Sequence, residues 1–171
     1  MVTRWWLLLM LWFPAMLQAF PADVLKLDEQ LKRLSLHPHL HYQVTDASVS
    51  IEDIVYEPEH HHAFSPVPSA DFSFKAQDKV VWFFTRLHYL GQRQQQLILD
   101  YNFPSANLVE FYSFDRQNHE LKKLNRAGTS LPFGERQIKS RTFAVPLQFK
   151  AEQELDILIK VQDGTLIVAS Y

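Results

Sequence analysis

The sequence predicts an all-β fold of the antiparallel sandwich class, and two observations support this prediction. Residues 141–149 and 155–161 both alternate in side-chain character with a period of two, as strands do when one face packs on a core. From residue 79 onward, further strand-like segments follow one another, separated by turn signals. This arrangement is typical of a β-sandwich or a jelly roll. At 171 residues the chain is long enough for one domain with its own core.

The composition excludes several classes of function. The formal net charge is −2, and the Lys and Arg residues are scattered along the chain, so the sequence lacks the basic surface that nucleic acid requires. The chain contains no cysteine, which excludes disulfides, thiolate zinc sites and cysteine nucleophiles. Thirteen phenylalanines supply aromatic surface for a β-rich core.

The amino terminus has the pattern of a secretory signal. Arg4 precedes an apolar run over residues 5–17, and Leu17-Gln18-Ala19 is a small-residue cleavage site. The run is shorter than the roughly 20 residues that span a bilayer. The sequence therefore predicts a signal-peptide helix over residues 1–19 and a periplasmic or otherwise exported domain over residues 20–171. An uncleaved signal would tether this domain to the inner membrane.

The first part of the mature chain has weak signals for regular structure. Residues 24–27 predict a short strand, whereas residues 30–36 fit either a helix or a strand. Ser50 as N-cap, with Asp53 three residues later, predicts one short helix near residues 50–56. The polar, proline-punctuated stretch over residues 57–68 predicts a loop.

The later part of the chain is predicted to form successive strands. They cover residues 80–89, 97–103, 108–114, 121–124, 141–149, 155–161 and 165–169, with a tight turn at residues 163–164. In the first of these, the residues of one parity are predicted to face the core: Val81, Phe83, Thr85, Leu87 and Tyr89.

The opposite parity of that strand provides the first candidate binding site. It holds Trp82, Phe84, Arg86 and His88, which combine flat aromatic rings with hydrogen-bonding groups. This combination suits a sugar, whose C–H faces stack on a ring while its hydroxyls pair with polar groups. The alternative is that Trp82 is an internal anchor of the sheet.

Arginines provide a second candidate. Arg126, Arg136 and Arg141 flank a long loop, where their forked guanidinium groups could bind a carboxylated or sugar ligand. Alternatively, Arg136 or Arg141 fastens the loop by bonding backbone carbonyls, or by pairing with Glu110 or Glu120.

Metal binding and catalysis have little support. His37, His39 and His41 could converge on a transition metal if they lay on a strand, but Pro38 weakens that geometry. The run over residues 60–62 is more typical of a solvated polar segment. The sequence has no nucleophile elbow, no phosphate-binding glycine loop and no carboxylate pair in an apolar setting. We therefore predict a non-catalytic protein without a metal or another cofactor.

An ordered series of residues resembles a known family, the type 2 extracellular domain of bacterial seven-transmembrane receptors with diverse intracellular signalling modules. The resemblance lies in Trp82, in Tyr112 within the strand 108–112, and in three motifs. The motifs are Gly128-x-x-Leu131-Pro132-Phe133-x-x-Arg136, Phe143-x-x-Pro146-Leu147 and Gly164-Thr165-Leu166. Residues 42–46 and 50–54 also resemble the opening of that domain. The resemblance covers residues 24–171.

The resemblance implies a jelly-roll β-sandwich similar to carbohydrate-binding modules. It also implies a sensory input domain outside the inner membrane, followed in the family by a seven-helix region and an output module. Because this sequence stops at Tyr171, we expect a truncated receptor or a free-standing copy of the sensor. Many members carry Arg two residues after the tryptophan, whereas this chain has Phe84 there and Arg86 further on.

Together, these signals predict a ligand-binding sensor domain for a carbohydrate or another small polar molecule, with a membrane receptor or signalling protein as a further partner. The predicted ligand-binding residues are Trp82, Arg86, His88, Tyr112, Arg126 and Arg136. The alternative is a protein-interaction or structural β-sandwich without a small ligand.

Overall fold

The computed structural model describes most of the chain after the amino terminus. The described residues are 23–68, 73–75, 79–102, 106–162 and 165–167. The predicted signal peptide over residues 1–19, the turn at residues 163–164 and the last residues of the strand at 165–169 lie outside these ranges. Among the described residues, no helix is both long enough and apolar enough to cross a membrane.

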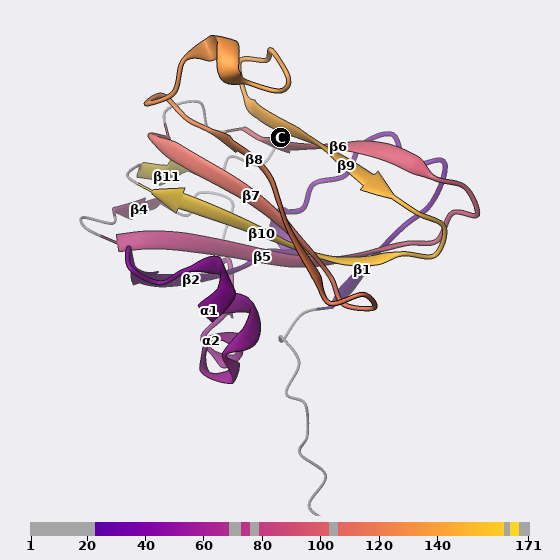
Figure 1. The fold of residues 1–171 in the computed structure, drawn as a ribbon, viewed down its shortest axis with the longest axis horizontal. Coiled ribbons are helices and arrows are strands. Elements are labelled where there is room, and N and C mark those ends of the chain that lie inside the picture. The colour runs from indigo at the N-terminus through magenta and orange to yellow at the C-terminus, as the bar shows by residue number, and fades with distance from the viewer. Residues whose placement is uncertain (1–22, 69–72, 76–78, 103–105, 163–164, 168–171) are drawn as a thin grey trace, which may run out of the picture.

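One large sheet forms the centre of the molecule, with strands in the order β3-β2-β5-β10-β7-β8 (Figure 1). Its strands are β2 (His41–Asp46), β3 (Ser65–Pro66), β5 (Lys79–Tyr89), β7 (Leu108–Asp115), β8 (Glu120–Ala127) and β10 (Glu154–Gln162). These neighbours pair antiparallel. The short β1 (Val24–Leu27) adds in parallel to the end of β5, next to Arg86 through Tyr89.

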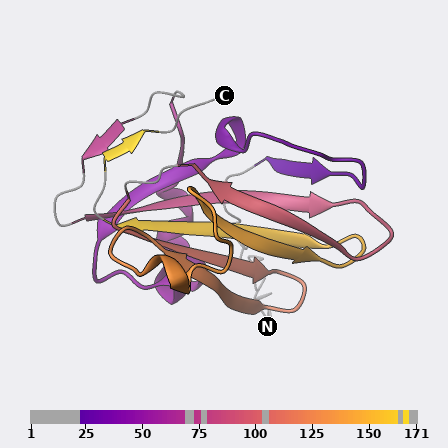
Figure 2. The ribbon, with the colours of Figure 1, turned by 90° about the horizontal axis from the view of Figure 1, so that it is seen from above.

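A smaller antiparallel sheet covers one face of the large one. It consists of β6 (Gln95–Tyr101) and β9 (Phe143–Phe149), with Leu99 opposite Val145. A third pair, β4 (Ser73–Lys75) with β11 (Thr165–Ile167), stands at one end of the molecule (Figure 2). The predicted all-β sandwich class is confirmed, whereas its jelly-roll connectivity stays a prediction.

The main core lies between the two sheets. It contains the predicted core-facing apolar residues of β5 together with inward residues of β6, β7, β9 and β10. Its fully buried members include Phe83, Tyr89, Phe111, Phe143, Phe149 and Ile157. The period-two pattern read from the sequence therefore identifies the strand faces correctly, because alternate residues of a strand project to opposite sides.

A second core lies on the other face of the large sheet. The short helix α1 (Ile51–Tyr56) packs on this face, on the side away from β6 and β9, and a second short helix, α2 (Pro58–His62), follows it (Figure 1). The buried apolar residues here are Ile51, Ile54, Val55, Phe64, Val80, Trp82, Phe84, Tyr112, Phe114 and Leu158. Both faces of β5 are consequently buried along almost its whole length.

The helices confirm one prediction and correct another. The N-cap of α1 is a full capping box, in which Asp53 N–H donates to Ser50 and Ser50 N–H donates to Asp53. The predicted loop over residues 57–68 is wrong in part, because it contains α2 and β3. Pro58 occupies the first turn of α2, where a missing N–H costs nothing, so this proline starts a helix.

Two other segments differ in detail from the expectation. Residues 30–36 form neither a helix nor a strand, and residues 37–39 form a single turn of 3-10 helix around Pro38. Strand β8 is longer than predicted. It pairs with β7 on both sides of a register shift between Phe111 and Tyr112, which interrupts the alternation that would identify a strand from sequence.

Candidate functional site

Trp82, the first predicted ligand-binding residue, has no exposed surface. Its indole N–H donates to Thr45 Oγ1 over 3.1 Å, and its ring centroid lies 6.1 Å from that of Tyr112. The Lys160 ammonium lies 5.0 Å from the indole ring. Trp82 is thus an internal anchor of the second core, which is the alternative that the sequence leaves open.

Arg86 is buried in an ion pair with Asp156. Its Nε and Nη2 atoms donate to the two carboxylate oxygens over 2.6 and 3.1 Å. Asp156 is fully buried and also accepts a hydrogen bond from Arg116 Nη1 over 3.4 Å. A carboxylate oxygen of Glu154 lies 3.3 Å from Arg86 Nε. This fork-to-carboxylate geometry occupies the groups that a ligand would need. The sequence analysis missed Asp156, although the antiparallel pairing of β5 with β10 places it directly opposite Arg86.

His88 and Tyr112 lie on the same face of the sheet as Trp82. The half-buried His88 has Nε2 at 3.9 Å from a Glu152 carboxylate oxygen. The Tyr112 hydroxyl donates to Glu110 over 3.1 Å, and burial together with this negative neighbour raises the pKa of Tyr112. Burial opposes ionisation of Glu110, but the hydrogen bond and charge of Lys123 outweigh it and lower the Glu110 pKa.

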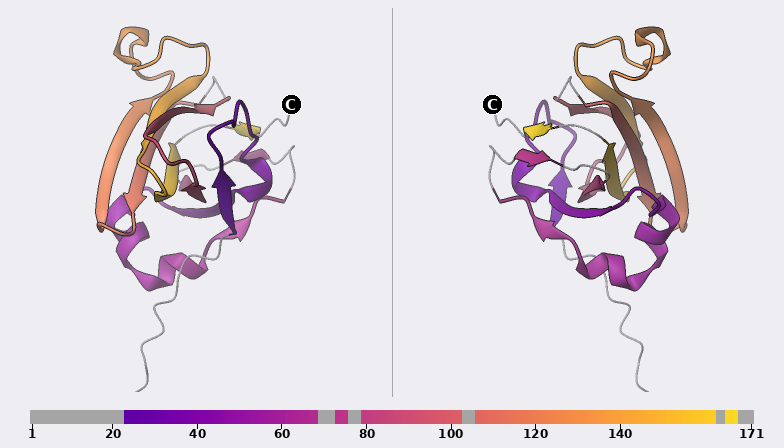
Figure 3. Two further views of the ribbon diagram at one scale, coloured as in Figure 1. Left: turned by 90° about the vertical axis from the view of Figure 1, so that its right-hand side faces the viewer. Right: turned by 90° about the vertical axis from the view of Figure 1, so that its left-hand side faces the viewer.

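The loop between β8 and β9, residues 128–142, stands out from the two sheets (Figure 3). Its Arg136 guanidinium lies 4.9 Å from the Phe133 ring centroid and 4.8 Å from that of Phe143. Arg136 also donates to the Ser140 carbonyl over 2.9 Å. This is the loop-fastening role weighed for Arg136. Arg126, by contrast, is exposed, and its nearest ionic partner is a Glu135 carboxylate oxygen 4.0 Å from Nη2.

The structure does not gather the six predicted residues around one hollow. Trp82 and Tyr112 touch each other, while Arg86 belongs to the ion-pair cluster with Asp156. Neither of the two hollows identified on the described surface is lined by any of the six. Ligand binding by these residues stays a prediction, and burial leaves His88, Arg126 and Arg136 as the more accessible of them.

The first hollow is wide and open, with a volume of about 680 Å³. It lies where the segments that follow β1 and β5 meet. Its lining residues are Asp28, Glu29, Gln30, Leu90, Gly91, Gln92 and Arg93. Here the Gln92 N–H donates to Glu29, which ties the two segments together.

The second hollow, which we call the sheet-edge cleft, has a volume of about 270 Å³. It opens between β7 and β8 of the large sheet and β9 of the small one. Its lining includes polar and apolar groups from several elements: Gln94, Ser113, Asp115, Glu120, Lys122, Leu124, Pro146, Leu147, Gln148, Phe149, Lys150, Gln153 and Leu155. The sequence analysis missed this cleft, because its residues converge only when strands from two sheets meet.

Asp115 forms the fixed polar floor of the sheet-edge cleft. Its oxygens accept from the backbone N–H groups of Gln117 and Asn118, and from the side chains of Asn118 and Gln153. Burial opposes ionisation, but these hydrogen bonds prevail and lower the pKa of Asp115. Ser113, which is also buried, and Lys122, which pairs with Glu120 at 2.9 Å, line the same cleft.

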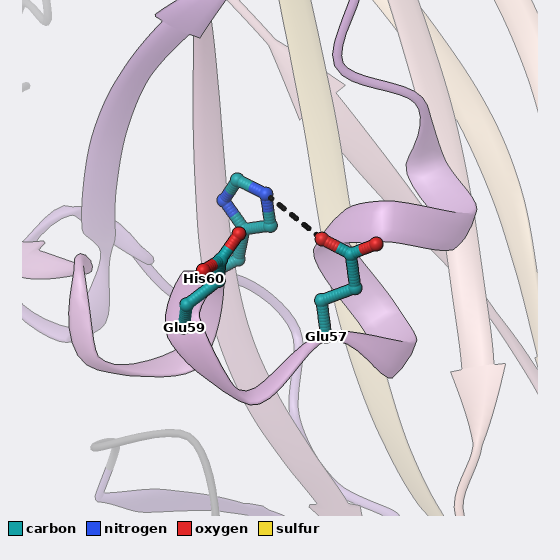
Figure 4. A group of neighbouring side chains, drawn as sticks. All are labelled: Glu57, Glu59 and His60. Atoms are coloured by element: carbon teal, nitrogen blue, oxygen red, sulfur yellow. Dashed lines mark ion pairs between the residues drawn. The ribbon is translucent and has the colours of Figure 1, made fainter.

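One group of possible metal ligands exists among the described residues (Figure 4). Glu57, Glu59 and His60 offer ligand atoms within 4.8 Å of one another at the start of α2. Both glutamates are exposed, and His60 Nε2 lies 3.7 Å from a Glu57 carboxylate oxygen. The described side chains of His37, His39 and His41 do not form such a group.

The fold defines a class of protein, the antiparallel β-sandwich domain. Within that class, the chain belongs to the 7TMR-DISM extracellular 2 family, which matches residues 40–170. This confirms the resemblance seen in the sequence, over a range that begins later than expected. The family is an extracellular domain of membrane receptors, and membership indicates a sensor input domain. A comparison with curated proteins found no match.

Proposed function

We propose that this chain is a non-catalytic, periplasmic sensor domain that binds a carbohydrate or another small polar molecule in the sheet-edge cleft. Family membership supports the sensor role. Residues 1–19 would direct export as a signal peptide, or tether the domain to the inner membrane if uncleaved. Occupancy would alter how the domain packs against a membrane receptor or signalling protein, since a ligand signals only by favouring one of two states.

The observation that carries the ligand proposal is the composition of the cleft. Apolar side chains such as Leu124 and Leu147 combine there with polar and charged side chains from several elements. Ligand pockets in proteins have this character, with volumes of about 300–1,000 Å³. At about 270 Å³ the cleft lies just below this range, which limits its ligand to a small molecule of roughly monosaccharide size. Ser113 and Lys122 would supply hydrogen bonds to the ligand. Asp115, held by its hydrogen bond from Gln153, would keep the floor of the cleft rigid.

A thermal-shift screen tests this proposal. Residues 20–171 would be titrated with a panel of neutral and acidic monosaccharides, disaccharides and organic acids. We expect at least one member to raise the melting temperature of the wild type, and to have no effect on a Leu124→Trp variant whose larger side chain fills the cleft. An Arg93→Ala variant, altered in the open hollow, should respond like the wild type. If no member of the panel stabilises the wild type, the proposal fails.

One observation favours the alternative, a protein-interaction domain without a small ligand. The aromatic residue that lines the cleft, Phe149, is fully buried and offers no open ring face for a sugar to stack on. Stacking on aromatic rings is a common feature of carbohydrate recognition. A negative screen, together with capture of a purified receptor or signalling partner by the folded domain, would support this alternative.

A further inference from the structure

The loop between β8 and β9 carries an unusual combination of exposed groups. Phe133, at its tip, is 54% exposed. Residues 126–141 include four basic side chains and a single acidic one, Glu135. Lys139 and Arg141 are exposed and have no ion pair within the described part of the chain. The Arg136 guanidinium lies 4.9 Å from the Phe133 ring centroid, and more than half of the Phe133 surface stays open to water.

The loop is held in place although it projects from the sandwich. At its base, Gly128 has φ +148°, and the Thr129 and Ser130 N–H groups donate to the Ala106 and Asn107 carbonyls. Further along, Pro132 and Phe133 accept the N–H groups of Glu135 and Arg136 in a 3-10 turn. The loop therefore holds Phe133 in one position, so little conformational entropy is lost when a partner binds.

We infer that this loop docks the domain on an anionic phospholipid surface, with Phe133 inserted among the headgroups and Arg126, Lys139 and Arg141 against the lipid phosphates. The charge of the loop complements such a surface. The family places the domain outside a membrane, where a bilayer is close by. This inference does not depend on the proposed ligand or on the sheet-edge cleft.

A lipid surface fits the loop better than a protein partner does. A stable protein interface buries about 800 Å² on each partner with matched shapes. The loop offers one protruding aromatic with half-buried Leu131 and Ile138 behind it. A small apolar insertion surrounded by diffuse positive charge is the arrangement by which peripheral proteins bind membranes.

Vesicle sedimentation tests the inference with residues 20–171, which include every residue of both cores. We expect binding to vesicles of phosphatidylglycerol mixed with phosphatidylcholine, and little binding to phosphatidylcholine alone. Binding should weaken as salt rises, because exposed charges are screened over about 10 Å at 0.1 M ionic strength. Phe133→Ser should lower the partition coefficient about tenfold. Lys139→Gln with Arg141→Gln should lower it by about the same factor.

Matched controls separate docking from general surface effects. Ile98→Ser removes an equally exposed apolar side chain from β6, and Lys32→Gln with Arg33→Gln removes two exposed cations elsewhere. Both should bind like the wild type, and all variants should keep the wild-type melting temperature. The inference is overturned if the mixed vesicles do not bind the wild type, or if the controls lose binding as the loop variants do. It is also overturned, in favour of an acidic protein partner, if the loop variants lose binding to polyglutamate but not to vesicles.

Discussion

At the scale of single residues, the Arg86–Asp156 ion pair shows how a functional-looking side chain can serve the fold. Both side chains are buried, and their geometry is bidentate. This face of the sheet can bury two charged side chains only because each partner neutralises the charge of the other. An arginine beside aromatic residues on a strand therefore indicates a sugar site only if the opposite strand lacks a carboxylate.

Arg86→Met tests this structural role. Removing one partner leaves Asp156 buried without its main counter-charge, so the free energy of unfolding should fall by about 3–5 kcal/mol. Chemical denaturation followed by tryptophan fluorescence would measure it. The double variant Arg86→Met with Asp156→Leu should recover most of the loss, since no lone charge then remains. Equal destabilisation by the single and double variants would contradict this account.

Gly128 is a second position where one residue controls a larger feature. Its φ is +148°, and a Cβ atom built there would lie 2.0 Å from the Asn107 carbonyl oxygen. Gly128→Ala should therefore destabilise the domain by at least about 2 kcal/mol. The matched control is Gly134→Ala, where an added Cβ meets nothing within 4 Å. Thermal melts would compare them, and similar losses in both variants would show that the loop base tolerates strain.

At the scale of elements, α1 depends on a cap that the sequence makes visible. Ser50 accepts the Asp53 N–H over 3.2 Å, and Asp53 accepts the Ser50 N–H over 2.8 Å. We expect Ser50→Ala to lower the free energy of unfolding by about 1 kcal/mol, because an orphan N–H loses its acceptor. Urea denaturation would measure the change. Ser35→Ala, at an exposed position outside any helix or strand, should have almost no effect. A neutral Ser50→Ala would mean that packing alone holds α1.

The elements predicted from sequence are those with a strong local pattern. The alternation in β5, β9 and β10 and the capping box of α1 could be read directly, because they depend on neighbours along the chain. Helix α2 could not, since Pro58 breaks a helix in most positions and starts one only at its first turn. The full length of β8 was also hidden, because the register shift opposite Tyr112 interrupts its period.

At the scale of the whole molecule, the central strands β5, β7 and β10 of the large sheet are buried on both faces. The two-stranded sheet of β6 and β9 covers one face, and α1 together with Phe64 packs on the other. The alternation in β5 shows which residues share a face, but not which elements cover each face. Trp82 was therefore predicted to be open to a sugar ligand. The sheet-edge cleft could not be predicted from the sequence for a related reason. Ser113, Lys122 and Gln148 lie far apart in the chain and meet only across two sheets.

Acid stability is a property of the whole domain that follows from several carboxylates together. The pKa values of Asp53, Glu110 and Asp115 are all lowered from their ordinary values of 3.8 for Asp and 4.5 for Glu. As the pH falls through these values, the unfolded chain takes up protons before the folded one does. Because the unfolded state then binds more protons, the free energy of unfolding decreases with falling pH. The stabilisation is complete at neutral pH and is lost below about pH 4.5.

Melting temperatures measured between about pH 7 and about pH 3 would check this expectation, and Asp115→Asn provides the matched variant. The variant loses one lowered carboxyl, so it should be less stable at neutral pH but should lose less on acidification. If the melting temperatures of the wild type and the variant fell in parallel on acidification, Asp115 would not be responsible for the loss of stability. The hydrogen bonds that Asp115 accepts from Asn118 and Gln153, which join the β7–β8 and β9–β10 turns, would then owe their strength to geometry and not to charge.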